Sequence, residues 1–539
     1  MIRAPFWSGW WGLASITAAV AATLGMTETG SRAAPTGQRP PAAELPRDSV
    51  DTRIIPPVGD TIRVRANGNL QRAIDRARPG DLILIEAGGV FEGPVRLRRK
   101  EGEGWITIRP DLPDEDFASS GERISPERAA RLPKILVRRN GQAGITTEPG
   151  ATYYRLIGLE IGAAPGVTMV NSLVWFGGGS DVQTSLSQVP HHLILDRSYV
   201  HGTATLDLRR CVVLNSAHSA VIDSYLSECH SNQGDAQAIV GWNGPGPFKI
   251  QNNYLEGSTM GIMFGGATSL PNLVPSDIEI RGNYFFKPLA WKGKWVVKNI
   301  LEIKSGQRIL VEGNLMEGSW LHAQTFAITT CSVGAAGQTW HKTTDFTFRY
   351  NVLRYIGAGF NLCEKYAGAT TSSARLTFQH NIIDHVNSGG YTGDGILVQL
   401  LGAIADLTFD HNTIVSTDGA IKQALGMNGP AYPRFRFTNN LLTRGQYGLF
   451  GSGEGISTLR AKAPGAIWTN NVLIGRRPQA PYPPTTYFAT LDQVGFVDSR
   501  NGDYRLAPSS AFRARGTRGQ PIGADAEKVQ ALLASVARR

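Results

Sequence analysis

The sequence is poor in charged residues and in cysteine. Asp, Glu, Lys and Arg make up 18% of its 539 residues, and the four cysteines stand at 211, 229, 331 and 363. Their spacing matches no zinc site, which argues against a zinc-bound fold. Four cysteines are compatible with an oxidising compartment. Cys331 and Cys363 are 32 positions apart and could lie on neighbouring repeats of a repetitive fold, while free buried thiols are the alternative.

Several functional motifs are also missing. There is no phosphate-binding glycine loop, no Ser-His-Asp order and no basic run interleaved with aromatic residues. A formal net charge of +10 nevertheless favours a polyanionic partner, and a solvated basic surface without a partner is the alternative. We expect no nucleic acid among the partners.

The N-terminal 57 residues differ in composition from the rest. Arg3 precedes an apolar stretch over 4–25, which is typical of an export signal. We assign 1–34 to this signal, with an uncleaved membrane anchor as the alternative, and 35–57 to a disordered, Pro-rich linker. No later segment is apolar enough to span a membrane, so we expect a secreted or periplasmic protein with no further membrane contact.

The rest of the chain repeats one short pattern, in which an alternating apolar run ends in Asn. The steps between successive Asn residues are 30, 31, 37, 30, 31, 28 and 31 residues, and a period near thirty is typical of a solenoid. We expect this Asn stack to be scaffold, since side-chain amides can satisfy backbone groups inside each bend. The repeated residues are Asn253, Asn283, Asn314, Asn351, Asn381, Asn412, Asn440 and Asn471.

Each repeat contains three short strands, which predicts an all-β cylinder with three parallel faces. The segment 69–78 has apolar residues at helical spacing and is predicted to form a helix that caps the open end of the first coil. We place the solenoid at 58–505 and a tail with a short helix at 506–539.

These repeats resemble the right-handed parallel β-helix proteins of the pectate-lyase-like superfamily. The run Ala-Ile-Asp-Arg-Ala-Arg-Pro-Gly-Asp-Leu-Ile-Leu at 73–84 and Pro-Ile-Gly-Ala-Asp at 521–525 also resemble the two ends of such proteins. The resemblance implies a right-handed parallel β-helix of about eleven coils with an N-terminal capping helix. It leaves the activity open, because this architecture is used by lyases, hydrolases, epimerases and non-catalytic fibres.

An unusual charged strand lies at 298–304. With Leu301 and Ile303 in the core, Lys298, Ile300, Glu302 and Lys304 are predicted to point outward, along roughly 13 Å of strand. Paired charges on an exposed strand are the plain alternative to a functional site.

A polar stretch precedes this strand by one or two coils. Trp242 offers an aromatic face on which a sugar can stack, and His230, Gln237 and Asn243 offer hydrogen bonds. Asp235 lies in the same stretch and is expected to approach Glu302 across the stacked strands.

Acidic-polysaccharide lyases of this superfamily use a Lys or Arg as the base and often a Ca²⁺ ion to neutralise the uronate carboxylate. The segment Glu302-Ile-Lys304-Ser305 resembles, with a shorter spacing, the acid and Lys-Ser segment of the alginate and chondroitin lyase branch. The resemblance implies that Lys304 or Lys298 is the base, with a pKa lowered by neighbouring cations. It implies that Glu302 and Asp235 hold the ion.

The first hypothesis is therefore a monomeric lyase that cleaves acidic polysaccharide by β-elimination. A non-catalytic carbohydrate-binding or surface-structural β-helix is the alternative from another class. A glycoside hydrolase or a uronan epimerase is a further alternative, and hydrolysis would pair Asp235 with a second carboxylate such as Asp394.

Overall fold

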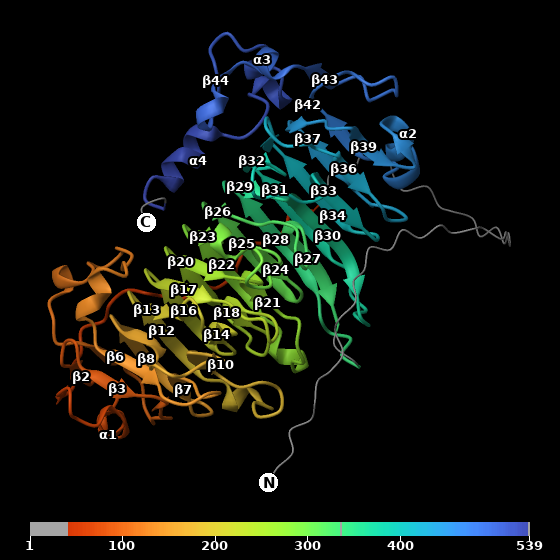
Figure 1. Cartoon of the computed structure of the whole chain (residues 1–539). Coiled ribbons are helices and arrows are strands. Elements are labelled where there is room, and N and C mark those ends of the chain that lie inside the picture. The colour runs from red at the N-terminus through yellow and green to blue at the C-terminus, as the bar shows by residue number, and fades with distance from the viewer. Residues whose placement is uncertain (1–40, 335–336, 537–539) are drawn as a thin grey trace. The chain divides into compact units, whose positions relative to one another are not determined.

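The computed structural model describes residues 41–334 and 337–536, and it is built almost entirely from strands (Figure 1). Three sheets of 14, 13 and 14 strands run the length of the molecule, and successive strands of each sheet come from successive coils. Within each sheet the coil-to-coil pairings are parallel, with a single antiparallel exception, the β39–β40 pair that ends one sheet. The predicted all-β, three-faced parallel β-helix is confirmed.

We name the sheets A, B and C in the order in which the chain passes through them. Sheet A contains β1 (Thr61–Val64), β2 (Leu82–Ile85), β5 (Ile106–Pro110), β8 (Thr152–Ile157), β12 (His191–Asp196), β16 (Ala217–Ile222), β19 (Phe248–Gln251), β22 (Ser276–Arg281), β25 (Gly306–Glu312), β28 (Thr343–Arg349), β31 (Ala374–Gln379), β34 (Ala405–Asp410), β37 (Arg436–Thr438) and β41 (Ile467–Thr469).

Sheet B follows sheet A in each coil, after the Asn turn. It contains β3 (Val90–Glu92), β6 (Lys134–Val137), β9 (Glu160–Ala163), β13 (Tyr199–His201), β17 (Tyr225–Cys229), β20 (Tyr254–Gly257), β23 (Tyr284–Phe286), β26 (Leu315–Glu317), β29 (Val352–Ile356), β32 (Ile382–Val386), β35 (Thr413–Val415), β38 (Leu441–Thr443), β42 (Asn471–Ile474) and β43 (Thr486–Ala489).

Sheet C completes each coil and holds the predicted third strands. It contains β4 (Val95–Leu97), β7 (Ile145–Thr147), β11 (Val174–Phe176), β15 (Arg210–Leu214), β18 (Gln237–Gly241), β21 (Met260–Phe264), β24 (Leu301–Ile303), β27 (Phe326–Val333), β30 (Ala358–Tyr366), β33 (Ile396–Leu401), β36 (Gln423–Met427), β39 (Tyr447–Gly451) and β40 (Gly453–Glu454). Two further pairs, β10 (Met169–Val170) with β14 (Asp207–Leu208) and β44 (Phe496–Asp498) with β45 (Asp503–Leu506), lie outside the three sheets.

The sheets have more strands than the eleven or so coils that the sequence predicted. The earliest coils lack the Asn of the later repeats, and Ser198 and Ser224 stand in its place on two of them. Ser224 accepts a hydrogen bond from the Ser198 amide at 3.0 Å, as the Asn side chains do in later coils. The early repeats are therefore structurally equivalent although their sequences do not show it.

The Asn stack is confirmed as scaffold. Asn253 accepts the backbone N–H of Ser224, and each later Asn accepts the backbone N–H of the Asn one coil earlier. The first such bond, from the Asn253 N–H to Asn283, is 2.9 Å long, and the last, from the Asn440 N–H to Asn471, is 3.0 Å long. Each side-chain amide also donates to a carbonyl of the neighbouring coil, as Asn381 does to Phe348 at 2.9 Å. Buried polar groups at the bend are thus satisfied without water.

The interior is one continuous apolar core that runs from Val64 to Leu473. Aromatic side chains stack along it from coil to coil, with ring centroids 4.6 Å apart between Phe378 and Phe409 and 4.7 Å apart between Phe437 and Trp468. The strand spacing of about 4.8 Å sets this distance, so one residue type at one position can repeat along the axis.

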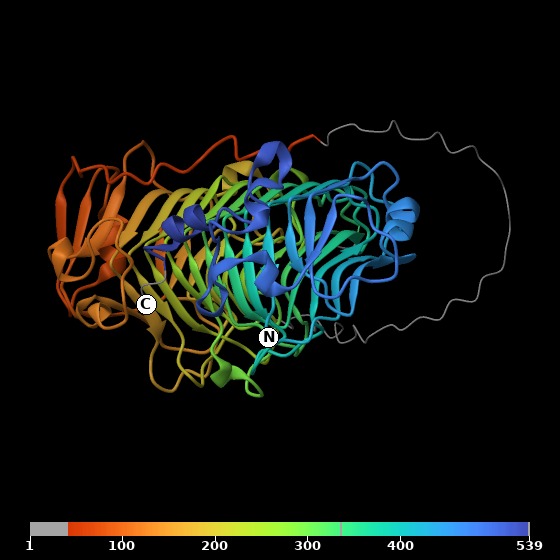
Figure 2. The same cartoon turned by 90° about the horizontal axis from the view of Figure 1, so that it is seen from above.

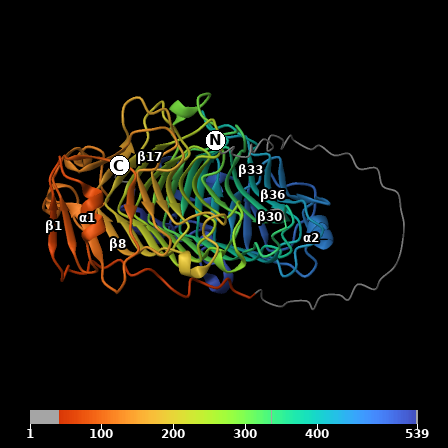
Figure 3. The same ribbon diagram turned by 90° about the horizontal axis from the view of Figure 1, so that it is seen from below.

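The two ends of the β-helix carry short helices (Figure 3). Helix α1 (Leu70–Arg76) lies at the β1 end. Asn69 is its N-cap, and the Asn69 side chain accepts a hydrogen bond from the Arg72 amide. Its apolar side faces the core through Leu70, Ala73 and Ile74, which confirms the predicted cap. Helix α2 (Ile456–Lys462) lies at the other end.

The C-terminal segment covers the outer face of sheet B. After β43 the chain forms α3 (Leu491–Val494), β44, β45 and α4 (Ala526–Leu533), and its side chains pack on outward residues such as Tyr284 and Val352. The strands of the three sheets therefore end at Ala489 rather than at the predicted 505. The predicted C-terminal helix corresponds to α4.

An N-terminal segment, residues 44–53, lies along the outer face of sheet A and is called the strap below (Figure 2). The Arg47 amide donates to Asp277 at 2.9 Å, and Val50 packs on Ile194 and Ala220. The prediction of a disordered linker over 35–57 does not hold for 44–53, because backbone groups of the strap find partners on the sheet. The expected export signal and the rest of the linker lie outside the described residues.

All four cysteines form disulfides, Cys211 with Cys229 and Cys331 with Cys363. The first joins β15 to β17 of the next coil, and the second joins β27 and β30 of adjacent coils. This decides between the two alternatives that the sequence left open. No helix within 41–334 or 337–536 has the length and apolar character needed to cross a bilayer.

Candidate functional site

The candidate site lies on the outer face of sheet C. Glu302 in β24 is in register with Met263 in β21 and Thr329 in β27, and all three belong to one outward-facing row. Leu301 and Ile303 point into the core, as predicted. Ile300 was expected to point outward but lies in the core, because two consecutive residues face inward where the chain bends into β24.

Two ion pairs hold the charged side chains of this face. The Lys298 ammonium lies 2.6 Å from a carboxylate oxygen of Asp235, and the Lys304 ammonium lies 3.4 Å from Glu302. The side chain of Glu302 is only 5% exposed, whereas that of Lys304 is 25% exposed. The structure thus brings together the four residues that were expected to act as bases and ion ligands.

Asp235 is the point on which the cations of the site converge. Burial alone would raise the pKa of its carboxyl, but Lys298, Lys304 and Arg209 lower the pKa below its usual value. Asp235 is therefore ionised at neutral pH. The Lys298–Asp235 pair also ties the segment before β18 to the segment before β24.

The pKa of Lys304 differs from the sequence-based expectation. Burial alone would lower it, but the carboxylates of Glu302 and Asp235 raise it above the usual value. The expectation that neighbouring cations lower this pKa is therefore wrong, because the nearest charged groups are carboxylates. Lys304 is an ammonium at neutral pH in the unliganded protein.

Arg209 and Arg210 were not identified from the sequence. Arg209 precedes β15 and Arg210 is its first residue. In sheet C, β15 is separated from β24 by β18 and β21. Both side chains are half-buried. The guanidinium of Arg210 lies over the ring of Trp242 at 5.6 Å. Burial, and then Arg209, lower the pKa of Arg210 to about 10. Two consecutive arginines before an apolar strand can be recognised in the sequence as a possible anion-binding pair. The sequence does not show that they lie near Asp235.

The predicted sugar contacts divide into two groups. Trp242 is half-exposed and keeps the expected aromatic surface. Gln237 is buried at the start of β18, and its side-chain carbonyl has no hydrogen-bond partner among the described residues. Both lie on the same face as Asp235 and remain candidates for ligand contact.

His230 and Asn243 are not available to a ligand in this structure. His230 is fully buried, stacks on Trp295 at 3.9 Å and shares a hydrogen bond with Glu228 at 2.7 Å. Asn243 is also fully buried and donates to the carbonyl oxygen of Gln183 at 3.2 Å. The expectation of sugar contact is corrected for both, because loops that the sequence did not place pack over them.

Asp394 does not complete a pair of carboxylates with Asp235. It is exposed before β33, five strands along sheet C from β18, a separation of about 24 Å at the usual strand spacing. An inverting hydrolase needs its two carboxyl groups about 6.5–9.5 Å apart. The pair that the sequence suggested for hydrolysis is therefore absent.

Glu302 and Asp235 do not form a convincing Ca²⁺ site by themselves. Ca²⁺ takes about six to eight oxygen ligands, whereas these two carboxylates are each paired with a lysine. Within the described ranges no group of three or more His, Cys, Asp or Glu residues is arranged to hold a metal ion. The donor set does not fit the ion that the resemblance implied, so no step below depends on it.

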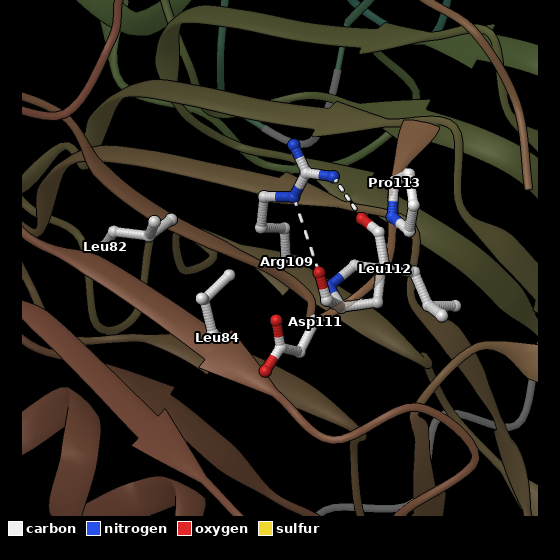
Figure 4. A pocket seen from close by; sticks show the side chains of 7 residues that line it. Leu82, Leu84, Arg109, Asp111, Leu112 and Pro113 are labelled. Atoms are coloured by element: carbon white, nitrogen blue, oxygen red, sulfur yellow. Dashed lines mark hydrogen bonds between the residues drawn. The ribbon is translucent and has the colours of Figure 1, made fainter. Parts of the chain in front are cut away.

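Two recessed pockets among the described residues lie elsewhere. One of about 330 Å³ lies on the outer face of sheet A and is lined by Leu82, Leu84, Arg109 and the segment 110–113 (Figure 4). Its Arg109 already donates to the carbonyl oxygen of Leu112 at 2.7 Å. Another of about 380 Å³ lies beside β43. Neither is lined by a residue of the candidate site.

Comparison with solved structures identifies polysaccharide-degrading enzymes of similar architecture. AlyGC, an alginate lyase of polysaccharide lyase family 6, matches with a TM-score of 0.51 at 14% identity, over 87% of this chain and 58% of that chain. A mannuronic-acid-specific family 6 lyase from human gut microbiota gives 0.42 at 12% identity, over 80% and 91%. The family 28 exopolygalacturonase of Yersinia enterocolitica gives 0.40 at 13%, over 79% and 78%.

No family model matches the sequence, and no curated protein sequence does either. At 14% identity the match to AlyGC shows a shared fold and nothing about shared activity, and this chain spans little more than half of that enzyme's length. Together with the three parallel sheets, it establishes that the protein is a right-handed parallel β-helix.

Proposed function

We propose that the outer face of sheet C binds an acidic polysaccharide and cleaves it by β-elimination. The observation that carries the proposal is the excess of positive charge around Asp235. Four cations, Arg209, Arg210, Lys298 and Lys304, act on this region, against the two carboxylates Asp235 and Glu302. A half-buried cluster with two uncompensated positive charges is costly unless an anionic ligand completes it.

The position of this cluster supports the same proposal. Within the described ranges the strap occupies the outer face of sheet A, and the C-terminal segment packs on sheet B. Sheet C carries neither, and its outward row combines Trp175, three buried apolar residues, Glu302 and polar residues. Aromatic rings beside charged hydrogen-bonding groups are the usual composition of a site for charged sugars.

Lys304 is the group best placed to move a proton, since it is the more exposed partner of its ion pair. In its neutral form, it would take the proton α to a uronate carboxylate. The electrons of that C–H bond would then form a carbon–carbon double bond, and the bond to the leaving sugar oxygen would break. The ammonium so formed would return the proton to that oxygen, so that protons and electrons balance.

The cations beside Lys304 would favour this reaction. Negative charge grows on the uronate carboxylate as the α proton leaves, and Lys298 can stabilise it electrostatically. The raised pKa of Lys304 sets a condition, because only its neutral form can accept a proton. We therefore propose an enzyme that works best under alkaline conditions.

The proposal is tested by incubating the purified protein with polygalacturonate, alginate and glycosaminoglycans, with and without Ca²⁺ or a chelator. β-Elimination leaves an unsaturated sugar, which is followed by its ultraviolet absorbance. We expect absorbance with at least one uronate polymer, and its loss in Lys304→Ala. Arg476→Gln is the control, since Arg476 is exposed and follows β42 of sheet B, many coils away from Lys304. Activity that persists in both Lys304→Ala and Lys298→Ala would show that the site is elsewhere.

A non-catalytic carbohydrate-binding protein is the second candidate. It is favoured by one observation, the protonated state of Lys304 at neutral pH. Binding to a uronate polymer that yields neither unsaturated product nor new reducing ends would support it. New reducing ends without unsaturated product would instead identify a hydrolase, and sugar inversion without cleavage an epimerase.

We further propose that the protein is exported and acts outside the cytoplasm. Two disulfides within the described residues are the support, because disulfides persist in oxidising compartments. Fractionation of the producing cells, followed by detection of the protein in the periplasm or medium, would test this.

A further inference from the structure

The outward row of sheet C differs on the two sides of Glu302. Toward the N-terminal coils it passes through Met263, Val240 and Val213 to Trp175, all paired in register. Toward the C-terminal coils it passes through Thr329, Asn361 and Gln399. The first side is apolar and aromatic, and the second is polar and uncharged.

The apolar side forms a separate cluster on the outside of the sheet. Val213, Val240, Met260 and Met263 are buried there, and the half-exposed rings of Trp175 and Trp242 pack against them. The exposed parts of these two rings suit the apolar face of a sugar ring, which is commonly placed against aromatic side chains.

Arg210 adds a positive charge beside this cluster. It stands at the start of β15, while Trp242 follows the end of the adjacent β18, so the side chain extends along the face to reach that ring. Among the described residues no carboxylate lies within 4.0 Å of Arg210 or Arg209, and the Nε of each is buried without a hydrogen-bond partner. The Nε–H groups of Arg209 and Arg210 are therefore two buried hydrogen-bond donors that have no acceptor among the described residues.

An unpaired guanidinium beside a tryptophan is a binding position for an anion. Its planar fork can donate two parallel hydrogen bonds to a carboxylate or to a sulfate. The stacking on Trp242 holds the guanidinium in place and limits the entropy lost when a ligand binds.

We infer that Arg210, with Arg209, Trp175 and Trp242, forms a subsite for an anionic substituent on a sugar other than the one that is cleaved. This rests on the proposed function, since it takes the reacting sugar to lie at Lys304. β15 and β24 are three strands apart, about 14 Å. The polysaccharide therefore extends from Lys304 toward the N-terminal coils, and acidic groups are required on that side only.

The test measures binding in the Lys304→Ala background, which prevents cleavage during titration. Acidic oligosaccharides of increasing length, taken from whichever uronate polymer the wild-type protein binds, are titrated calorimetrically. We expect Arg210→Gln to weaken binding of the longer oligomers by about 10-fold to 100-fold, the usual effect of losing a charged hydrogen bond. The shortest oligomers should bind equally to both proteins, because they cannot reach from Lys304 to Arg210.

Two further variants keep the test decisive. Arg210→Lys keeps the charge without the fork and should lose part of the affinity, and Arg476→Gln should lose none. Unfolding midpoints are measured for each variant, and if Arg210→Gln does not fold, Arg210→Lys alone must show a length-dependent loss. A carboxyl-reduced oligomer and a neutral sulfated oligomer distinguish a carboxylate from a sulfate as the bound group.

The outcomes separate the two proposals. Equal affinity of a folded Arg210→Gln variant for long oligomers would overturn the subsite while leaving the proposed function intact. Equal losses for short and long oligomers would place Arg210 at the reacting sugar and would also overturn it. No binding of any acidic oligosaccharide by the wild-type site would overturn both.

Discussion

Lys304 has one property that favours a role as a catalytic base and one that opposes it. Its side chain is accessible, yet its pKa is raised by the carboxylates of Glu302 and Asp235 against the effect of burial. A general base is most efficient when its pKa lies near the working pH. If Lys304 is the base, the reaction rate should depend on the charges of Glu302 and Asp235, because these set the pKa of Lys304.

The first prediction concerns pH. If Lys304 acts as the base, the cleavage rate should rise with pH in the alkaline range, because the neutral amine becomes more abundant. Glu302→Gln removes the first of the two raising charges, so the pKa of Lys304 should fall and the rising limb should move to lower pH. Rates with saturating polymer across a pH series provide the measurement. An unchanged limb in Glu302→Gln would assign the titration to another group.

The second prediction concerns the Asn stack. Asn381 accepts the Asn351 amide at 3.0 Å and donates to the carbonyl oxygen of Phe348 at 2.9 Å. Asn381→Ala leaves both backbone groups buried without partners, at about 1–3 kcal/mol each. We expect a loss of about 2–6 kcal/mol in the free energy of unfolding, measured by chemical denaturation. Asn428→Ala, at an exposed position, should cost little. Equal losses would mean that the stack adds nothing beyond local structure.

At the scale of elements, the strap is a feature that the sequence did not reveal. It binds through backbone amides, Glu44 to Asp345 at 3.2 Å and Arg47 to Asp277 at 2.9 Å. The same two aspartates pair with Arg375 and Arg308 of neighbouring coils. The strap therefore completes an ion-paired ladder along sheet A and bridges coils that are far apart in sequence.

The third prediction follows from these contacts. A variant that begins after residue 53 should unfold at lower denaturant, because Val50 no longer covers Ile194 and Ala220 and the two amide contacts are lost. Burial of one valine contributes about 1.5–3 kcal/mol and each hydrogen bond about 1, so we expect a loss of about 3.5–5 kcal/mol. Activity on sheet C should remain. A variant of unchanged stability would show that the strap binds without contributing to the fold.

At the scale of the whole molecule, the three faces differ in what covers them. The strap lies on sheet A and the C-terminal segment packs on sheet B, and the outer face of sheet C is the one on which we propose that a long polymer lies. A solenoid suits such a ligand, because its outward positions repeat every 4.8 Å or so along the axis and form an extended surface.

The fourth prediction tests this division. Hydrogen exchange with and without a bound acidic oligosaccharide should slow in the segments around 209–213, 233–242 and 291–304, which line the outer face of sheet C. Peptides from the strap and from α4 should exchange at unchanged rates, since they lie on the other faces. Protection spread over sheets A or B would contradict the assignment of the binding face.

Much of this architecture was readable from the sequence. The Asn steps near thirty residues predicted the stacked coils, and the two-residue period placed Leu301 and Ile303 inside and Glu302 outside. These features depend on local backbone geometry and on the apolar pattern within single coils. Local information is sufficient for them.

Only the tertiary structure decided which of the candidate site residues are buried and which charged groups pair with one another. His230 and Asn243 have the composition of ligand contacts, but the loops packed over them, through Trp295 and Gln183, remove them from the surface. Lys298 finds Asp235, and Arg210 reaches Trp242, only because coils of unequal length stack in one particular register. The repeat pattern determined the β-helix by itself, because each coil repeats the same local geometry. The charge balance of its candidate site arises from contacts between coils, and the spacing along the chain carries no record of them.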